Sequence, residues 1–439
     1  NVARLAQLGL GEDQLFGSAD WSIGGRGDDQ SFIVSLEADG RGLGSRLPYP
    51  LAKDEASIGR VAVNLTDETD GRTFSVRVFD VTDIRGVLDS KPLTLEVMTP
   101  EADLIGWATL PSGDGDRSNL SILLRTERLL LGETPLAVDK TAIVLRPQEF
   151  NVSFDGSELA GRVSRVGEGP LLIDLERMVL PEGGDLLDPP DDDPLFDYNP
   201  GELPSMKVRI STLLRGETRY EDMDLVLVSG ESRLDATTLE FDRDGQRFQG
   251  ELAWAYQNGQ GQTALLLRAQ GDELGNILRV NEDEPLLEAE SGRFVSNLSW
   301  DGSPLGFSLL TSRGVVELSL KNGRFLDLGN SAEVLRLFGI LNIETVTRRL
   351  RLDFLDLVQP GVAFDSVDAK ARIADGQLVF DPEFTMSGPS ASFRLTGEAD
   401  LINEKLKQRL EVDIPLTNNL PLASVLLGAP QVGGAIYLV

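Results

Sequence analysis

The sequence predicts an all-β protein, an elongated and curled antiparallel sheet that forms an apolar groove and carries only a few short helices. Apolar and polar residues alternate along most of the 439 residues. Aspartate-glycine or asparagine-glycine pairs separate the alternating segments. Helical patterns are scarce. A period of two places successive side chains on opposite faces of a strand, so each segment is expected to have one apolar and one polar face.

The alternating segments follow one another along the chain. In 73–81 (TFSVRVFDV), the apolar residues Phe74, Val76 and Val78 alternate with polar ones. The same pattern returns in 206–210, 316–321, 349–354 and 405–414. Roughly 26 such segments, at ~4.8 Å per strand, would make one sheet about 120 Å long. The few predicted helices cannot cover an apolar face of that length, so we expect a gutter rather than a compact domain.

Hairpin turns are predicted between the segments, because Asx-Gly pairs supply the positive φ angles that tight turns need. Such pairs occur at Asp39-Gly40, Asp70-Gly71, Asp155-Gly156, Asp244-Gly245, Asn258-Gly259, Asp301-Gly302, Asn322-Gly323 and Asp375-Gly376. The expected connectivity is a long antiparallel meander.

Two short helices and one boundary interrupt this pattern. Segment 331–342 has Ser331 as a potential cap and an apolar stripe that includes Phe338, and 421–427 (PLASVLL) is a second candidate helix. Segment 181–204 contains PPDDDP and is read as an acidic, proline-rich loop or linker. We therefore expect an N-terminal β-rich segment of the groove over 1–180 and a C-terminal β-groove over 205–439.

The composition excludes several functions. The net charge of −30 repels phosphate backbones, so nucleic acid is not an expected partner. The chain has no histidine and no cysteine, which removes Ser-His and Cys-His catalysis and thiolate metal sites. An enzyme would have to rely on carboxylates, lysine, tyrosine or an oxygen-bound cation, and we expect none.

The acidic residues do not form a recognisable site. Asp188, Asp191, Asp192 and Asp193 lack the spacing of a calcium loop and are better explained as a solvated loop. A calcium loop beginning at Asp114 would need glutamate where Arg125 stands. With 71 acidic residues, some pair of carboxylates is always close, so two neighbouring carboxylates do not indicate a glycosidase. We expect no cofactor and no metal.

The apolar stripes are the informative feature. One strand with an apolar stripe is usually part of an ordinary core, but a whole series with few aromatic residues and few covering helices favours a groove for acyl chains. Alternation assigns these residues to its lining: Met206, Val208, Ile210, Leu252, Trp254, Leu265, Leu267, Phe294, Leu298, Val316, Leu318, Leu320, Leu350, Leu352, Phe354, Phe393, Leu395, Leu410, Val412 and Ile414.

Both ends of the chain are expected to be internal to a longer protein. The chain begins at Asn1 without a signal-like segment, and residues 414–439 contain no charged residue. This tail is long enough to span a membrane, but prolines and Asn418 and Asn419 interrupt it, which favours a short apolar helix.

Several short segments carry a family resemblance. They are 47–53 (LPYPLAK), 203–204, 298–304 (LSWDGSP), 323–329 (GRFLDLG), 337–342 (LFGILN), 348–354 (RRLRLDF), 361–365 (GVAFD), 388–390 and the tail from 420. Together they resemble the C-terminal region of YhdP-type AsmA-like proteins, densely from about residue 203 onward. The block 348–365 is the most specific.

The resemblance implies a bridge-like lipid transfer protein of the Gram-negative envelope. Such a protein would be anchored in the inner membrane, extend through the periplasm and carry phospholipid between the inner and outer membranes. The family supplies no catalytic residues. Two alternatives remain: an envelope scaffold that offers strand edges to outer-membrane proteins, as in TamB-like relatives, and a polysaccharide-acting β-protein. Exposed strand edges would favour the first, and exposed aromatic platforms the second.

Overall fold

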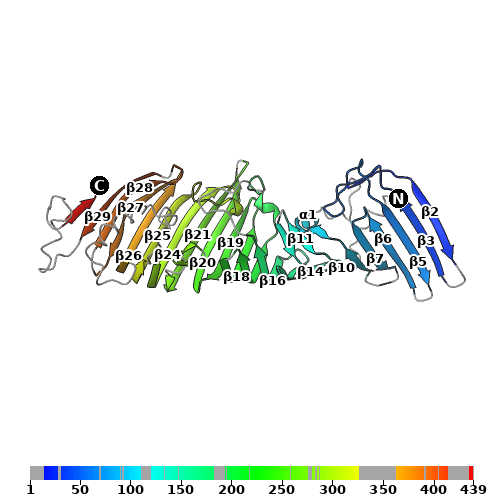
Figure 1. Ribbon diagram of the computed structural model, residues 1–439, viewed down its shortest axis with the longest axis horizontal. Coiled ribbons are helices and arrows are strands. Elements are labelled where there is room, and N and C mark those ends of the chain that lie inside the picture. Colours follow the sequence, from blue (N-terminus) through cyan, green and yellow to red (C-terminus); the bar gives the residue numbers. More distant parts are fainter. Residues whose placement is uncertain are drawn as a thin grey trace. The chain divides into compact units, whose positions relative to one another are not determined.

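The computed structural model confirms an all-β fold dominated by antiparallel pairing (Figure 1). It describes residues 14–27, 31–68, 71–88, 90, 93–109, 120–132, 134–146, 148–181, 193, 195–216, 218–257, 259–274, 279–281, 284–285, 287–325, 362–389, 392–403, 405–413 and 435–438. Contacts divide the chain into two compact units. Unit 1 comprises Asn1–Pro181 and Met206–Gly216, and unit 2 comprises Glu182–Ser205 and Glu217–Val439.

Unit 1 is built on one large sheet whose strands pair mostly in chain order. The paired strands are β2 (Trp21–Gly27), β3 (Ser31–Ala38), β5 (Val61–Glu68), β6 (Gly71–Val78), β7 (Thr82–Val87), β8 (Leu93–Met98), β10 (Leu120–Arg125), β13 (Lys140–Arg146), β14 (Glu149–Asp155), β15 (Leu159–Val166), β16 (Leu171–Leu180) and β17 (Met206–Arg215).

Two pairs in this sheet are parallel, which the expected meander did not include. Strand β10 pairs parallel to β8, and β17 pairs parallel to β16. Two parallel neighbours need a long connection, because the chain must return to the end of the sheet at which the first strand began. The connections are the segment between β8 and β10 and the acidic, proline-rich segment before β17. Their length is visible in the sequence, but the return direction is not.

Several short elements of unit 1 pair with one another outside the large sheet. Strand β1 (Leu15–Gly17) pairs with β4 (Leu43–Ser45). Strand β11 (Arg128–Leu131) pairs with both β9 (Glu101–Asp103) and β12 (Thr134–Ala137). Helix α1 (Leu104–Thr109) follows β9 and was not predicted. The buried side chains Leu47, Leu129, Leu136 and Val138 belong to these elements and their loops.

The strands of unit 2 pair antiparallel and in chain order. Its strands are β18 (Thr218–Ser229), β19 (Arg233–Arg243), β20 (Gln246–Gln257), β21 (Gln260–Asp272), β24 (Leu287–Asp301), β25 (Arg313–Phe325), β26 (Val362–Ala374), β27 (Gln377–Ser387), β28 (Ser392–Asp400), β29 (Lys405–Asp413) and β30 (Ala435–Leu438). Strands β22 (Arg279–Asn281) and β23 (Glu284–Pro285) form a small hairpin, and η3 (Pro200–Glu202) and η5 (Pro304–Gly306) are single 3₁₀ turns.

The Asx-Gly pairs do not all form hairpin turns. Asp244-Gly245 and Asp375-Gly376 have positive φ at both positions, as a tight turn requires. Asn322-Gly323 instead lies inside β25. There Asn322 has φ of 50°, and β25 keeps the same register with β26 on both sides of it. The predicted turn at this pair is therefore wrong, because asparagine can also adopt a positive φ within a strand.

The described part of the acidic segment packs against unit 2. The carboxylate of Asp193 accepts hydrogen bonds from the backbone N–H and the hydroxyl of Ser303, at 2.8 and 2.7 Å. The ring of Tyr198 lies 6.3 Å from that of Trp254. This segment is therefore docked on the strand ends near η5.

Two predicted helices, 331–342 and 421–427, lie outside the described residues. Of the uncharged tail, residues 435–438 are described, and they form β30 paired with β29. Among the described residues, no helix combines the length and the apolar character needed to cross a membrane.

Candidate functional site: an apolar sheet face

Pairing register turns the alternation of each strand into apolar rows that run across the sheet. In unit 2 one row connects Leu320, Val367, Met386, Phe393 and Val412 through successive strand pairs. A second row begins Leu252, Leu265 and Leu298 and continues across β25 to Ile373 and Leu378. Because directly paired residues share a sheet face, these rows lie on one side of the sheet.

The structure brings most of the predicted lining residues to shared faces. In unit 2 the register places thirteen on the same face: Leu252, Trp254, Leu265, Leu267, Phe294, Leu298, Val316, Leu318, Leu320, Phe393, Leu395, Leu410 and Val412. Met206, Val208 and Ile210 belong to unit 1, where they pair with Leu171, Ile173 and Leu175. Leu350, Leu352, Phe354 and Ile414 lie outside the described residues.

The apolar face of unit 2 is largely covered. Leu320 and Val367 are each 1% exposed, and Leu298 is 5% exposed. Side chains from the connections between strands pack against this face. The fully buried Leu274 follows β21, and Phe307 and Leu309 follow η5. The ring of Phe307 meets Trp300 edge-on at 5.0 Å. Interdigitated side chains therefore form a core over this part of the sheet.

Unit 1 has a corresponding face that our assignment of lining residues omitted, apart from the residues of β17. Its two central rows carry no ionisable side chain. One row runs Ile23, Leu36, Val63, Val76, Ile84, Val97, Leu124, Thr141, Phe154, Gly161, Leu175 and Ile210; the other runs Gly25, Val34, Leu65, Phe74, Gly86, Leu95, Ile122, Ile143, Val152, Val163, Ile173 and Val208. The same alternation was present in the sequence of this region and could have identified them.

Glycines in these rows leave room for aromatic rings from the neighbouring strand. A methyl group added to Gly86 would stand 2.6 Å from a ring carbon of its cross-strand partner Phe74. The ring therefore occupies the space above the glycine. The row stays apolar at this point although Gly86 itself has no side chain.

The opposite face of each sheet carries paired charges. Arg77 binds Asp83 through two hydrogen bonds of 2.8 and 2.9 Å between directly paired residues. This contact lowers the pKa of Asp83. In unit 2, Lys370 lies 2.8 Å from Glu317 and lowers the pKa of that carboxyl. Exposed pairs of this kind contribute little stability individually but mark the solvent face.

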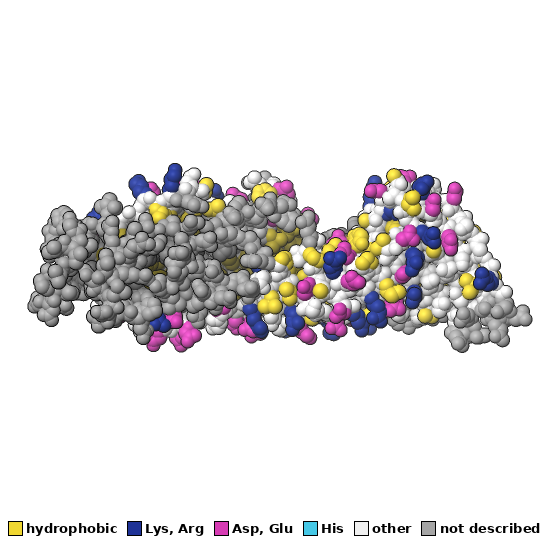
Figure 2. All heavy atoms as spheres, viewed as in Figure 1, with side chains coloured by type: hydrophobic (Ala, Val, Ile, Leu, Met, Phe, Trp, Pro, Cys, Tyr) yellow, Lys and Arg dark blue, Asp and Glu magenta, His cyan; other side chains and the backbone are white. Residues whose placement is uncertain are grey.

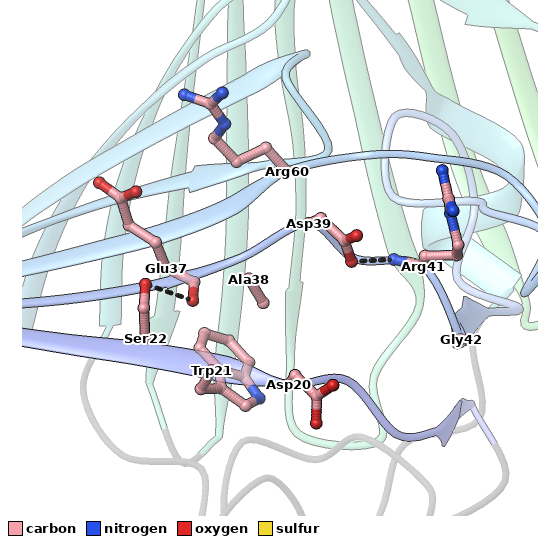
Figure 3. Close-up of a pocket in the computed structure, with 9 residues that line it drawn as sticks. All are labelled: Asp20, Trp21, Ser22, Glu37, Ala38, Asp39, Arg41, Gly42 and Arg60. Carbon is pink, nitrogen blue, oxygen red and sulfur yellow. Dashed lines mark hydrogen bonds between the residues drawn. The ribbon is translucent and has the colours of Figure 1, made fainter.

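A polar hollow lies at one end of strands β2 and β3 (Figure 3). Its volume is about 730 Å³, and its lining includes Asp20, Trp21 and Arg60. The backbone N–H of Arg41 donates to the Asp39 carboxylate at 2.9 Å. Figure 3 shows that Arg41 and Arg60 extend away from Asp20 and Trp21, so these groups do not converge on a common point. Within the described residues, no three acidic side chains form a group that could hold a metal ion.

Comparison with known proteins adds to this geometry. The family described as YhdP protein matches residues 3–439, almost the whole chain. This chain belongs to the YhdP family. The intermembrane phospholipid transporter YhdP of Escherichia coli strain K12 is 23% identical over 214 residues, which are 48% of this chain and 16% of that protein. The chain therefore aligns with a small part of this YhdP relative's length. No solved structure matches the chain.

Proposed function

We propose that the chain takes part in moving phospholipid between the inner and outer membranes, and that its apolar sheet face holds the acyl chains. The observation that carries this proposal is the pair of uncharged rows that run from strand to strand across unit 1, from β2 to β17. Membership of the YhdP family supports the same assignment. A sheet face of this kind offers hydrocarbon a continuous apolar contact in place of water.

The energetic reason for such a face is the cost of exposing hydrocarbon. A phospholipid with ~30 methylene groups would expose them at ~0.8 kcal/mol each, or roughly 24 kcal/mol, if it crossed water unaided. A continuous apolar track lowers this barrier by contact alone. No covalent step is required, and we propose that the chain is not an enzyme.

The lipid species is not selected by the central rows, because they offer no charged or strongly polar group to a headgroup. In the proposed arrangement the headgroup stays in water beyond the margins of the face. We place the protein in the periplasm, with an inner-membrane anchor in the full-length protein. Met206, Val208 and Ile210, which were assigned from the sequence, lie on the unit 1 face and are part of the proposed track.

Lipid extraction followed by a transfer assay tests the proposal. The purified chain should retain phospholipid in native mass spectrometry and should accelerate the movement of fluorescent phosphatidylcholine between vesicles. Free fatty acid should compete for binding, whereas glycerophosphocholine, which has the headgroup without acyl chains, should not. A folded chain that carries no lipid and leaves the vesicle exchange rate unchanged would refute the proposal.

A scaffold for outer-membrane proteins is the second candidate, and one observation favours it. Every residue of β2 is exposed, and among the described strands β2 pairs only with β3. An exposed strand edge can accept another chain by strand addition. Binding of an unfolded barrel protein that competes with β2, without any lipid binding, would favour this candidate.

A further inference from the structure

We infer that phospholipid acyl chains bind the open apolar face of unit 1, whereas the corresponding face of unit 2 is a protein core that lipid does not enter in this conformation. This inference rests on the proposed function and refines it by locating the binding surface. It differs from the sequence-based assignment, which placed the lining residues on β17 and in unit 2.

The first argument is the difference in exposure between equivalent rows. In unit 1, Ile23 is 74%, Phe32 53% and Leu65 37% exposed, and all three point to the apolar face according to the register. In unit 2, Leu320 and Val367 on the apolar face are each 1% exposed. Apolar side chains of this size are stabilised by full burial, so the unit 1 face retains a large unused driving force for binding hydrocarbon.

The second argument is what covers the two faces. Leu274, Phe307, Leu309 and Leu401 fill the face of unit 2 from its own connections. In unit 1, most residues of the two central rows that lie between β3 and β10 remain half-buried, including Val34, Phe74, Leu95 and Ile122. Figure 2 shows apolar side chains, interspersed with charged ones, at the surface of unit 1 over the β10–β16 region.

The third argument identifies the occupant as hydrocarbon. The two central rows are separated by two residues along each strand, or about 7 Å. Together the rows form a track that is narrow along the strands and long across them. No ionisable group interrupts the central rows, so an acyl chain bound along them would not bury an unpaired charge. A flexible acyl chain fits a track of this shape and chemistry.

Photo-crosslinking on the full chain tests the inference. The chain is incubated with vesicles of phosphatidylcholine that carries a diazirine on one acyl chain, and adducts are mapped by peptide mass spectrometry. We expect most adducts on peptides of β3, β5, β6, β8 and β10, at least about tenfold above those of β24, β25 and β26. Equal or greater labelling of the unit 2 strands would overturn the inference but leave the proposed function intact.

Two matched variants on β8 sharpen the result. Leu95→Asp places a carboxylate on the apolar face, and Thr94→Asp places the same charge on the opposite face one residue away. Leu95→Asp should reduce unit 1 adducts and retained lipid at least about fivefold, and Thr94→Asp should leave both unchanged. Each variant also carries Ser35→Cys, the single cysteine of the chain, with a fluorescent label attached to it. An emission spectrum equal to that of the labelled parent chain shows that the variant is folded.

The outcomes separate the two proposals. Retained lipid with adducts in unit 1 that Leu95→Asp removes supports both. Retained lipid that Leu95→Asp leaves unaltered overturns the location and preserves the transfer function. A folded chain that yields neither adducts nor extractable lipid overturns both proposals together.

Discussion

Single side chains fix the loops at the margin of unit 1. Lys53 is half-buried, and its ammonium donates to the carbonyl oxygens of Gly40, Leu43, Asp54 and Ser57 at 2.7–3.0 Å. It also lies 5.5 Å from the centre of the Phe79 ring. One cation therefore holds the segment between β3 and β5 together. The sequence segment 47–53 was notable for its family resemblance, but its spacing did not predict these contacts.

Replacing Lys53 should loosen this segment without unfolding the sheet. In Lys53→Met, the carbonyls lose a charged donor, and we expect a loss of about 1–3 kcal/mol in local stability. Hydrogen exchange of the amides in 40–59 measures it. Lys407→Met serves as the control, because the Lys407 side chain is 87% exposed. Equal protection of 40–59 in both variants would show that the contacts of Lys53 contribute nothing.

The ion pair between Glu317 and Lys370 should make the pairing of β25 with β26 depend on pH. The pKa of Glu317 is lowered, chiefly by its hydrogen bond to Lys370. Its contribution is therefore fully present above the ordinary pKa of a glutamate side chain and disappears as the pH falls through the lower pKa of the folded state. Glu317→Gln should lower the protection of these strands at pH 7 by at most about 1 kcal/mol.

The same comparison at low pH provides the check. Near pH 3 and in 1 M salt, wild type and Glu317→Gln should show the same hydrogen-exchange protection in β25 and β26. A difference that persists at low pH would mean that the substitution acts through packing and not through the charge.

At the scale of single elements, bulges and glycines decide how strands pair. Gly161 lies at the point where the β15–β16 register shifts, and its φ is 135°. An added methyl group there would lie 2.5 Å from the backbone oxygen of Asp174 and 2.5 Å from the Cα of Leu175. Backbone atoms cannot move aside as a side chain can, so only glycine fits.

Gly161→Ala should therefore be costly. Both the positive φ and the contact with backbone oppose it, and we expect a loss of about 2–3 kcal/mol in the stability of β15 and β16. Urea unfolding and hydrogen exchange of these strands measure the loss. Gly24→Ala is the control, because nothing lies within 4 Å of the added methyl group. Comparable stability of the two variants would contradict the steric argument.

At the scale of the whole molecule, the charge governs behaviour in salt and near membranes. At a net charge of −30, the acidic side chains repel one another and also repel anionic lipid headgroups. Lipid uptake should therefore rely on apolar contact. This charge is readable from composition, whereas its placement away from the central rows depends on strand register.

We expect salt to raise the melting temperature of the chain and to speed lipid uptake from anionic vesicles. At low ionic strength, uptake from phosphatidylglycerol vesicles should be slower than uptake from phosphatidylcholine vesicles. The difference should vanish near 0.5 M salt, where the Debye length is only about 4 Å. Faster uptake from anionic vesicles at low salt would point to a basic docking patch and contradict this prediction.

The sequence by itself determined the all-β class, the apolar and polar side of individual strands, and several turns. A period of two is a local property, so residues such as Val316 and Leu318 could be assigned to one side without a structure. Asp375-Gly376 could likewise be read as a turn, because its positive φ angles are a local requirement.

Only the tertiary structure decided which strands pair in parallel, where the bulges lie and which apolar face is covered. The parallel partners of β8 and β16 depend on where long connections return. Leu320 and Val34 alternate in the same way in the sequence, yet Leu320 is buried and Val34 is half-exposed. Burial is set by side chains distant in the sequence, such as Leu274 and Phe307, and alternation within one strand carries no information about them.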